Sequence, residues 1–240
     1  MATQLGPTPM TLAQDLFTSG TTQNHVLGEK AYSNDGRTFR YVKVGAAALV
    51  PGNVLQSPAV TAAHTNITPT AVSAVGDTTI TTSSITTVAN EYANGTMVVE
   101  KGSTGAGLTY LIKSNPAVSA AACTFVLSDP ISVATTGTIT VSFIRNPYNG
   151  VIQYPITTGT GTPVGVAVTP IAIGGFGWIC SRGITGVLAD GAQTVGVTGA
   201  AVPAGAAGAA KVMAATLFQI GVWSKTTIDT QITPCYLTLD

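Results

Sequence analysis

Two histidines and three cysteines are the residues of this sequence that could bind a transition metal or act as nucleophiles. His25 and His64 have no second histidine, cysteine or carboxylate at metal-ligand spacing, and the HExxH motif is absent. Cys123, Cys180 and Cys235 lie far apart without CxxC spacing, which favours three small buried side chains. The sequence therefore predicts no metal site, and the odd number of thiols fits synthesis in a reducing cytoplasm.

Carboxylates and one serine-containing segment are the other candidates for catalysis. A glycosidase needs two converging carboxylates, but Asp129, Asp190 and Asp229 each stand beside turn-forming residues and are more simply turn caps. The segment Cys180–Gly183 lacks the G-x-S-x-G pattern and a nearby base. The glycine-rich stretch 159–165 lacks lysine and has a proline where a phosphate-binding helix would begin. We therefore expect that the protein is not an enzyme and binds no cofactor. A hydrolase with two catalytic carboxylates ranks third among our hypotheses.

The charge content is unusually low. Charged residues make up 8% of the chain, and ten basic residues cancel ten acidic ones, which argues against electrostatic binding to nucleic acid. The first residues lack the basic and apolar regions of a signal peptide, and glycines and a proline interrupt the apolar stretch 195–223, so we expect no membrane segment. With 45% hydrophobic residues the chain is expected to fold, and its weakly charged surface favours association with other protein.

Short runs rich in threonine, valine and isoleucine, separated by glycine, proline and asparagine, predict an all-β protein with two small β-barrel or sandwich lobes. The polar residues 1–28 are expected to form an extended N-terminal arm that becomes ordered on a partner. Residues 65–145 contain regularly recurring strands and are expected to form an inserted β-lobe, which ends at the turn 146–150. Residues 29–64 together with 146–240 would then form the main β-barrel domain.

One predicted strand carries both basic and aromatic side chains, namely Arg37, Phe39, Arg40, Tyr41 and Lys43. The cluster has too few cations for nucleic acid, where several phosphate contacts are needed. Neither face of the strand is cleanly apolar, which places it at a sheet edge or an interface. Arginine and tyrosine are enriched in protein interfaces, so these five residues are our candidates for a subunit or capsid contact, with a solvated strand face as the other interpretation.

Three stretches of the sequence resemble the capsid decoration proteins of tailed bacteriophages, also called cement or auxiliary head proteins. They are the Pro-Gly turn segment 45–55, the small-residue strands within 164–188, and the closing strands 220–223 and 236–239. Their order and spacing are similar to that family's barrel. Residues 65–145 are a departure, because compact members of the family lack so long an insertion.

The resemblance implies a virion structural protein on the capsid exterior, made in the host cytoplasm, that binds the major capsid protein and stabilises the shell. It also implies a homo-oligomer, and closure by rotation makes a trimer at a local threefold the expected form. It implies no catalytic residue, cofactor or metal, and no nucleic-acid or membrane partner. The alternative is a tail- or fibre-associated β-protein that binds a host-surface glycan.

Overall fold

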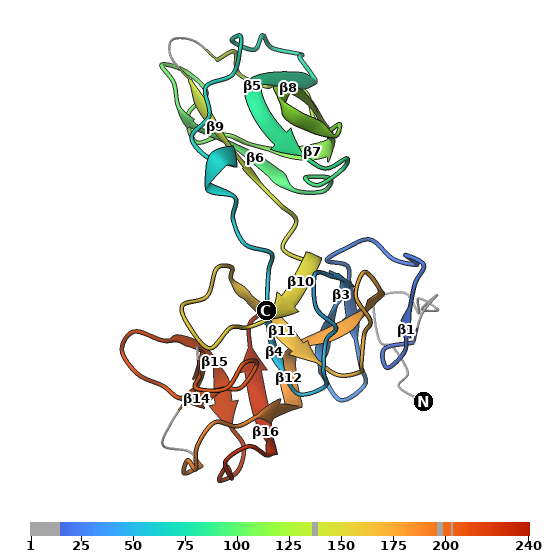
Figure 1. Ribbon diagram of the computed structural model, residues 1–240, viewed down its shortest axis with the longest axis vertical. Coiled ribbons are helices and arrows are strands. Elements are labelled where there is room, and N and C mark those ends of the chain that lie inside the picture. The colour runs from blue at the N-terminus through green and yellow to red at the C-terminus, as the bar shows by residue number, and fades with distance from the viewer. Residues whose placement is uncertain (1–14, 136–138, 196–198, 203) are drawn as a thin grey trace. The chain divides into compact units, whose positions relative to one another are not determined.

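A computed structural model describes residues 15–135, 139–195, 199–202 and 204–240 (Figure 1). The described chain is all-β, as predicted; its one helical element is the 3-10 turn η1 (Ala62–His64). None of the described residues form a helix with the length and hydropathy needed to cross a membrane.

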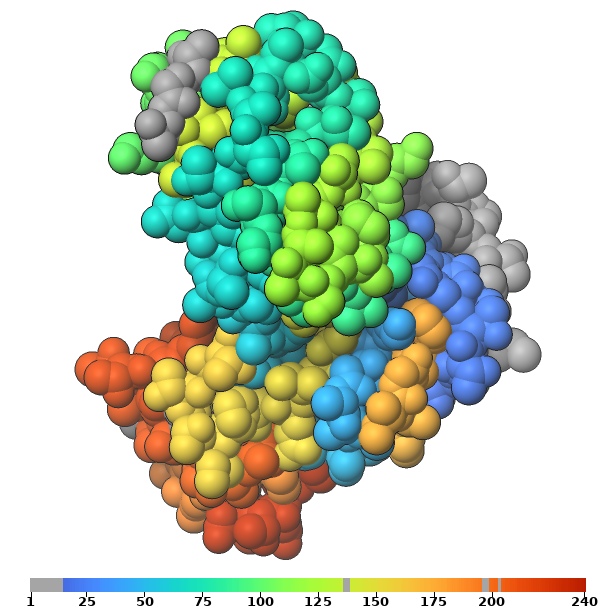
Figure 2. Space-filling view, turned by 45° about the horizontal axis from the view of Figure 1, so that its top comes forward, coloured from blue at the N-terminus to red at the C-terminus, as the bar shows by residue number. Residues whose placement is uncertain are grey.

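The described chain divides into two compact units. Unit 1 contains the described residues up to Ala59 together with Pro147–Asp240, and unit 2 contains Val60–Asn146. The predicted insertion spanned residues 65–145, whereas the division by contacts lies at residues 60 and 146. Because both ends of the chain build unit 1, blue, gold and red atoms adjoin on its surface in the space-filling view (Figure 2).

Five strands of unit 1 close into a small barrel. In order around the ring these are β3 (Thr38–Val44), β12 (Phe176–Leu188), β11 (Pro163–Ala167), β4 (Val54–Gln56) and β10 (Asn149–Gln153), which pairs again with β3. Side chains alternate between the two faces of a strand, and one face of each strand contributes to a common buried cluster. That cluster includes Val42, Leu55, Val151, Val164 and Ile179 and fills the barrel.

The thirteen-residue strand β12 connects the barrel to the other strands of the same eleven-stranded sheet. Its first half pairs with β3, and residues Arg182–Leu188 pair with β16 (Ile232–Thr238). Beyond β16 the sheet continues through β15 (Phe218–Trp223), β13 (Gly199–Val202) and β14 (Lys211–Val212). The partner changes at a register shift, next to Gly183 with its φ of +94°. Glycine suits this bend because a Cβ would be strained there and would lie 3.1 Å from the Arg37 Cα.

The other faces of the barrel strands pack into a second cluster with β13, β15 and β16. Trp178 and Trp223 are its largest fully buried side chains, and the Trp178 ring meets the Tyr41 ring edge-on at 5.0 Å between centroids. The turn at Pro51–Gly52 forms as its sequence predicts. The Asn53 N–H donates to the Val50 carbonyl at 3.1 Å, and Gly52 takes a φ of +85°.

The described part of the predicted N-terminal arm packs against its own unit. The short strand β1 (Ser19–Gly20) pairs with the start of β12, and Leu16 is buried in the cluster that contains Trp178. The Asn24 N–H donates to the Tyr41 hydroxyl at 3.1 Å, and β2 (Lys30–Tyr32) pairs with β3. Residues 15–28 therefore differ from the extended arm expected from the sequence, because Leu16 buries apolar surface here; residues 1–14 lie outside the described residues.

Unit 2 is a five-stranded antiparallel sheet curved into a half-barrel (Figure 1). Its order is β5 (Thr79–Thr87), β8 (Val118–Leu127), β7 (Thr109–Ser114), β6 (Thr96–Lys101) and β9 (Thr140–Ile144). Single bridges from Ile67 to Val141 and from Pro69 to Thr82 connect the two outer strands. Its separate core centres on Phe125 and Phe143, whose rings stack at 3.8 Å between centroids.

Candidate interaction sites

The strand with the predicted contact residues lies inside the sheet, not at an edge. β3 pairs with β2, β12 and β10. Phe39 and Tyr41 have exposed fractions of 0% and belong to the core of unit 1. Burial of both aromatic side chains against Trp178 and its neighbours stabilises the fold more than a half-exposed position on the strand would. They are therefore unable to contact a partner in the folded unit.

Arg40 is occupied within its own unit. Its guanidinium forms a bidentate ion pair with Asp240 at 2.6 and 2.7 Å and donates to the Gly28 carbonyl at 2.7 Å. Lys30 at 3.0 Å and the Ser181 hydroxyl at 3.1 Å complete the shell around the Asp240 carboxylate. Burial alone would raise the pKa of Asp240, but the hydrogen bonds from Arg40 and Lys30 and the Arg40 charge lower it to about 2.

Arg37 and Lys43, the other two predicted contact residues, are half-buried. Arg37 pairs with Asp35 at 2.7 Å and lies over the rings of Phe17 and Phe39, at 5.6 and 5.3 Å from their centroids. The Lys43 ammonium lies 5.8 Å from the centroid of the Phe176 ring. All three cationic residues of the predicted set are thus partly buried, and the structure does not bring the five together as one exposed face.

A different surface of unit 1 is both exposed and apolar. We call it the apolar sheet face; it consists of Ile184 on β12, Val222 on β15, and Ile232, Pro234 and Tyr236 on β16. Tyr236 stands directly opposite Ile184 on one side and Val222 on the other. The exposed fractions of Ile184, Ile232 and Tyr236 are 56%, 53% and 43%.

The apolar sheet face departs from the usual pattern of a sheet with one solvated side, whose outward positions are polar. The three strands that carry it include a single charged residue, Arg182, at the end of the paired region. Contiguous exposed apolar surface with little charge is typical of a site that another protein covers. The sequence contained a signal for it, because Ile232, Pro234 and Tyr236 alternate along β16 with a second set that includes the apolar residues Cys235 and Leu237.

Unit 2 holds a cavity of about 480 Å³ whose lining is mostly apolar, with several hydroxyl groups and two charged residues. Its charged lining residues are Glu91 and Arg145, which form an ion pair, and the Arg145 guanidinium also donates to the Thr61 hydroxyl at 3.2 Å. His64, a buried residue of the cavity lining, hydrogen-bonds the Tyr92 hydroxyl through Nδ1, and burial lowers the pKa of its imidazole. The cavity therefore offers hydroxyl and charged hydrogen-bonding groups with no net charge.

The other chemistry-bearing residues of the described chain have structural partners. Among these residues, no group of three or more histidine, cysteine or acidic side chains could hold a metal ion. Burial raises the pKa of Cys180 to about 11 and that of Cys235 to about 12. Asp190 accepts the Gly205 N–H and Asp229 accepts the Gly191 N–H, so each connects two loops that are distant in sequence instead of capping its own turn as predicted.

Comparisons with family models, with curated proteins and with solved structures found no match.

Proposed function

We propose that this chain is a virion structural protein that decorates the exterior of a tailed-bacteriophage head. In this proposal it binds the major capsid protein and its own copies, forms a homo-oligomer, a trimer at a local threefold, and stabilises the shell without chemistry. The observation that carries the proposal is the apolar sheet face, where Ile184, Val222 and Tyr236 lie exposed side by side. Such a surface is costly in water unless a partner covers it.

The low charge of the chain supports the same function. Ten basic and ten acidic residues in 240 give little long-range repulsion between copies. Many modest contacts on a lattice become strong together because each bound copy raises the effective concentration of the next contact. A decoration protein therefore needs no single tight binding site. The resemblance of segment 45–55 and of the closing strands to that family supports the same function.

Binding to phage heads tests the proposal directly. Purified protein is mixed with empty heads of the phage that encodes it, and the heads are sedimented and analysed for bound protein. We expect saturable binding at a fixed number of copies per head, and light scattering should detect a closed oligomer. A protein that stays monomeric at every concentration and does not sediment with heads would overturn the proposal.

The cavity of unit 2 favours one second candidate, a tail- or fibre-associated protein that binds a host-surface glycan. Its Arg145–Glu91 pair and the Thr61 hydroxyl provide both donors and acceptors for the hydroxyl groups of a sugar. A glycan array separates the two candidates. Strong, selective binding to one glycan, lost in Arg145→Met, would favour the second candidate over the first.

A further inference from the structure

Half of β12 has a pairing partner on one edge only. Residues Gly183–Val187 pair with β16, and on the other edge the described β3 ladder ends at Arg182. The next described backbone hydrogen bond on that edge is made by Leu188, whose N–H donates to the carbonyl of the turn residue Gly52 at 2.8 Å. Backbone N–H groups alternate between the two edges of a strand, so those of Ile184 and Gly186 point to the same edge as that of Leu188. No described strand pairs with these groups.

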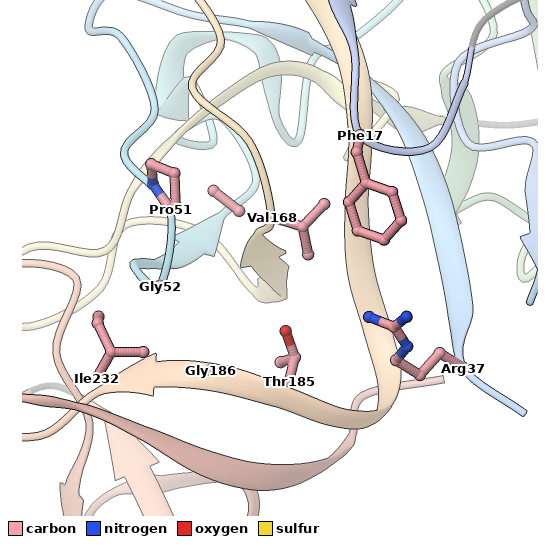
Figure 3. Close-up of a pocket in the computed structure, with 9 residues that line it drawn as sticks. Phe17, Arg37, Pro51, Gly52, Val168, Thr185, Gly186 and Ile232 are labelled. Atoms are coloured by element: carbon pink, nitrogen blue, oxygen red, sulfur yellow. The ribbon is translucent and has the colours of Figure 1, made fainter. Parts of the chain in front are cut away.

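A cavity of about 260 Å³ lies along this edge (Figure 3). We call it the β12 slot. Thr185 and Gly186 form its floor, and Arg37 and the Pro51–Gly52 turn flank it in the close-up. Its walls are completed by Phe17, Val168 and Ile232, all apolar. The slot thus combines unpaired strand edge with room beside it, which is the arrangement that accepts an added strand.

The lining of the β12 slot carries no acidic residue, and Arg37 is its one cation. The ion pair with Asp35 at 2.7 Å compensates that cation. A charged peptide would lose its hydration on entry without gaining an opposite charge. The electrostatics therefore favour an uncharged, extended segment. Five residues of strand extend about 17 Å, so the gap from Gly183 to Val187 suits a segment of similar length.

We infer that the β12 slot is filled by the N-terminal segment of a second copy of this chain, added as a strand along the free edge. This inference rests on the proposed function, because it states how copies of a shell protein contact one another. The affinity would come from main-chain hydrogen bonds, and the apolar walls would select small or aliphatic side chains.

The sequence and the start of the described chain support this occupant. Residues 1–14 contain no charged residue, and their last five, Met10–Gln14, contain no proline, so each of these five can donate a backbone hydrogen bond. Residues 1–14 lie outside the described residues; the described chain starts at Asp15, and Phe17 already forms part of the slot wall. The segment is therefore joined to the chain at the wall of one slot, and its fourteen residues can span up to about 46 Å when extended, enough to reach the slot of an adjoining copy.

Hydrogen exchange of the full-length chain tests the inference. The Ile184 and Gly186 amides should exchange rapidly in dilute, dissociated protein and about tenfold more slowly at concentrations where the protein associates. Leu12→Asp places a charge within the proline-free stretch and should abolish that protection. Ala2→Asp adds the same charge outside the stretch and serves as the matched control, which should keep the protection.

The outcomes separate this inference from the proposed function. If the protein associates or binds heads while the Ile184 and Gly186 amides stay unprotected, the slot assignment is wrong and the proposed function stands. Protection that is independent of concentration would assign the slot to the segment of the same chain and would overturn the second-copy inference. A chain that neither associates nor binds heads would overturn both.

Discussion

The outer sheet surfaces of the two units use different residues for the same β-geometry. Unit 1 exposes Ile184, Val222 and Tyr236 at neighbouring positions. The β5–β8 pair of unit 2 presents threonines instead, and the hydroxyls of Thr81 and Thr124 hydrogen-bond across the strands at 2.8 Å. Threonine has the β-branched shape that suits a strand, but its hydroxyl keeps the face hydrated.

This contrast distinguishes the two units by how their exposed strands interact with water. A hydroxyl-rich face forms hydrogen bonds with water. Removing water from the apolar sheet face, by contrast, lowers the free energy of the system. Under the proposed function, unit 1 makes the contacts of the assembly and unit 2 stays exposed to solvent. If the units differ in this way, substitutions in one should leave the other unchanged, first of all in its unfolding.

Removing a core aromatic side chain should destabilise only the unit that contains it. Trp178→Ala in unit 1 and Phe143→Ala in unit 2 should each cost about 3–5 kcal/mol of unfolding free energy, because each leaves a large cavity. Both tryptophans lie in unit 1, so tryptophan fluorescence follows that unit, while circular dichroism follows both. Phe143→Ala should shift part of the dichroism transition and leave the fluorescence transition in place.

An equal shift of both signals in Phe143→Ala would show that the two units unfold as one. In that case the two units would differ in their exposed surfaces but not in their unfolding. The cores give the reason to expect otherwise, since the buried clusters of unit 1 and unit 2 share no member.

A charge on the apolar sheet face should weaken association by about 10- to 100-fold, which corresponds to one hot-spot residue. Tyr236→Asp places it between Ile184 and Val222, at a position that is already 43% exposed, so folding should be unaffected. Thr124→Asp is the matched control on the exposed face of unit 2. Analytical ultracentrifugation measures the change, and an equal loss in both variants would remove the distinction between the two faces.

The Asp240 ion cluster should make unit 1 sensitive to acid. The folded pKa of about 2 lies below the ordinary value of 3.8, so the stabilisation is complete above pH 3.8 and is lost as the pH falls towards 2. Asp240→Asn should remove about 1–2 kcal/mol at neutral pH, after allowance for solvent screening, and flatten this acid dependence. Fluorescence-monitored denaturation at several pH values measures both effects.

Asp35→Asn is the control for that cluster. Asp35 also pairs with an arginine, Arg37, at 2.7 Å, but its side chain is 55% exposed, and exposed pairs contribute little. We expect a change below about 0.5 kcal/mol. A larger loss in Asp35→Asn than in Asp240→Asn would mean that the shell around Asp240 does not stabilise unit 1.

The sequence predicted the fold class because β-branched runs and turn residues act locally. The Pro51–Gly52 turn is an example, since its geometry depends on two adjacent residues. The environment of β3 could not be predicted in this way. From its sequence neighbours, Arg40 is expected to be an exposed cation. In the folded chain Asp240, two hundred positions later, lies beside it. The pairing of Glu91 with Arg145 in the unit 2 cavity is hidden for the same reason.

The apolar sheet face was within reach of the sequence but was missed. The alternation of Ile232, Pro234 and Tyr236 with Thr233, Cys235 and Leu237 has apolar residues on both faces of the strand. Such a strand is either buried on both sides or has one face available to a partner. The choice between them depends on what covers the strand, which is decided by the three-dimensional arrangement of β12, β15 and β16.

The three cysteines provide the finest test of the comparison, because they report the opening of each unit without any change in sequence. Burial raises the pKa of Cys180 and Cys235 in unit 1, to about 11 and about 12, and also raises that of Cys123 in unit 2. At pH 8 about one Cys180 thiol in a thousand, and fewer for Cys235, would be ionised even if reagent could reach it. Alkylation should therefore be negligible in the folded chain.

Mass spectrometry after iodoacetamide labelling at increasing denaturant should then record two opening events. Cys123 should become labelled together with the dichroism change that Phe143→Ala shifts, and Cys180 with Cys235 should follow the tryptophan signal. Rapid labelling of Cys235 in native buffer would contradict the burial of its side chain on the inner face of β16. Because the thiol of Cys235 lies on the opposite side of that strand from Tyr236, its labelling in Tyr236→Asp also shows directly whether the variant changes the surface alone.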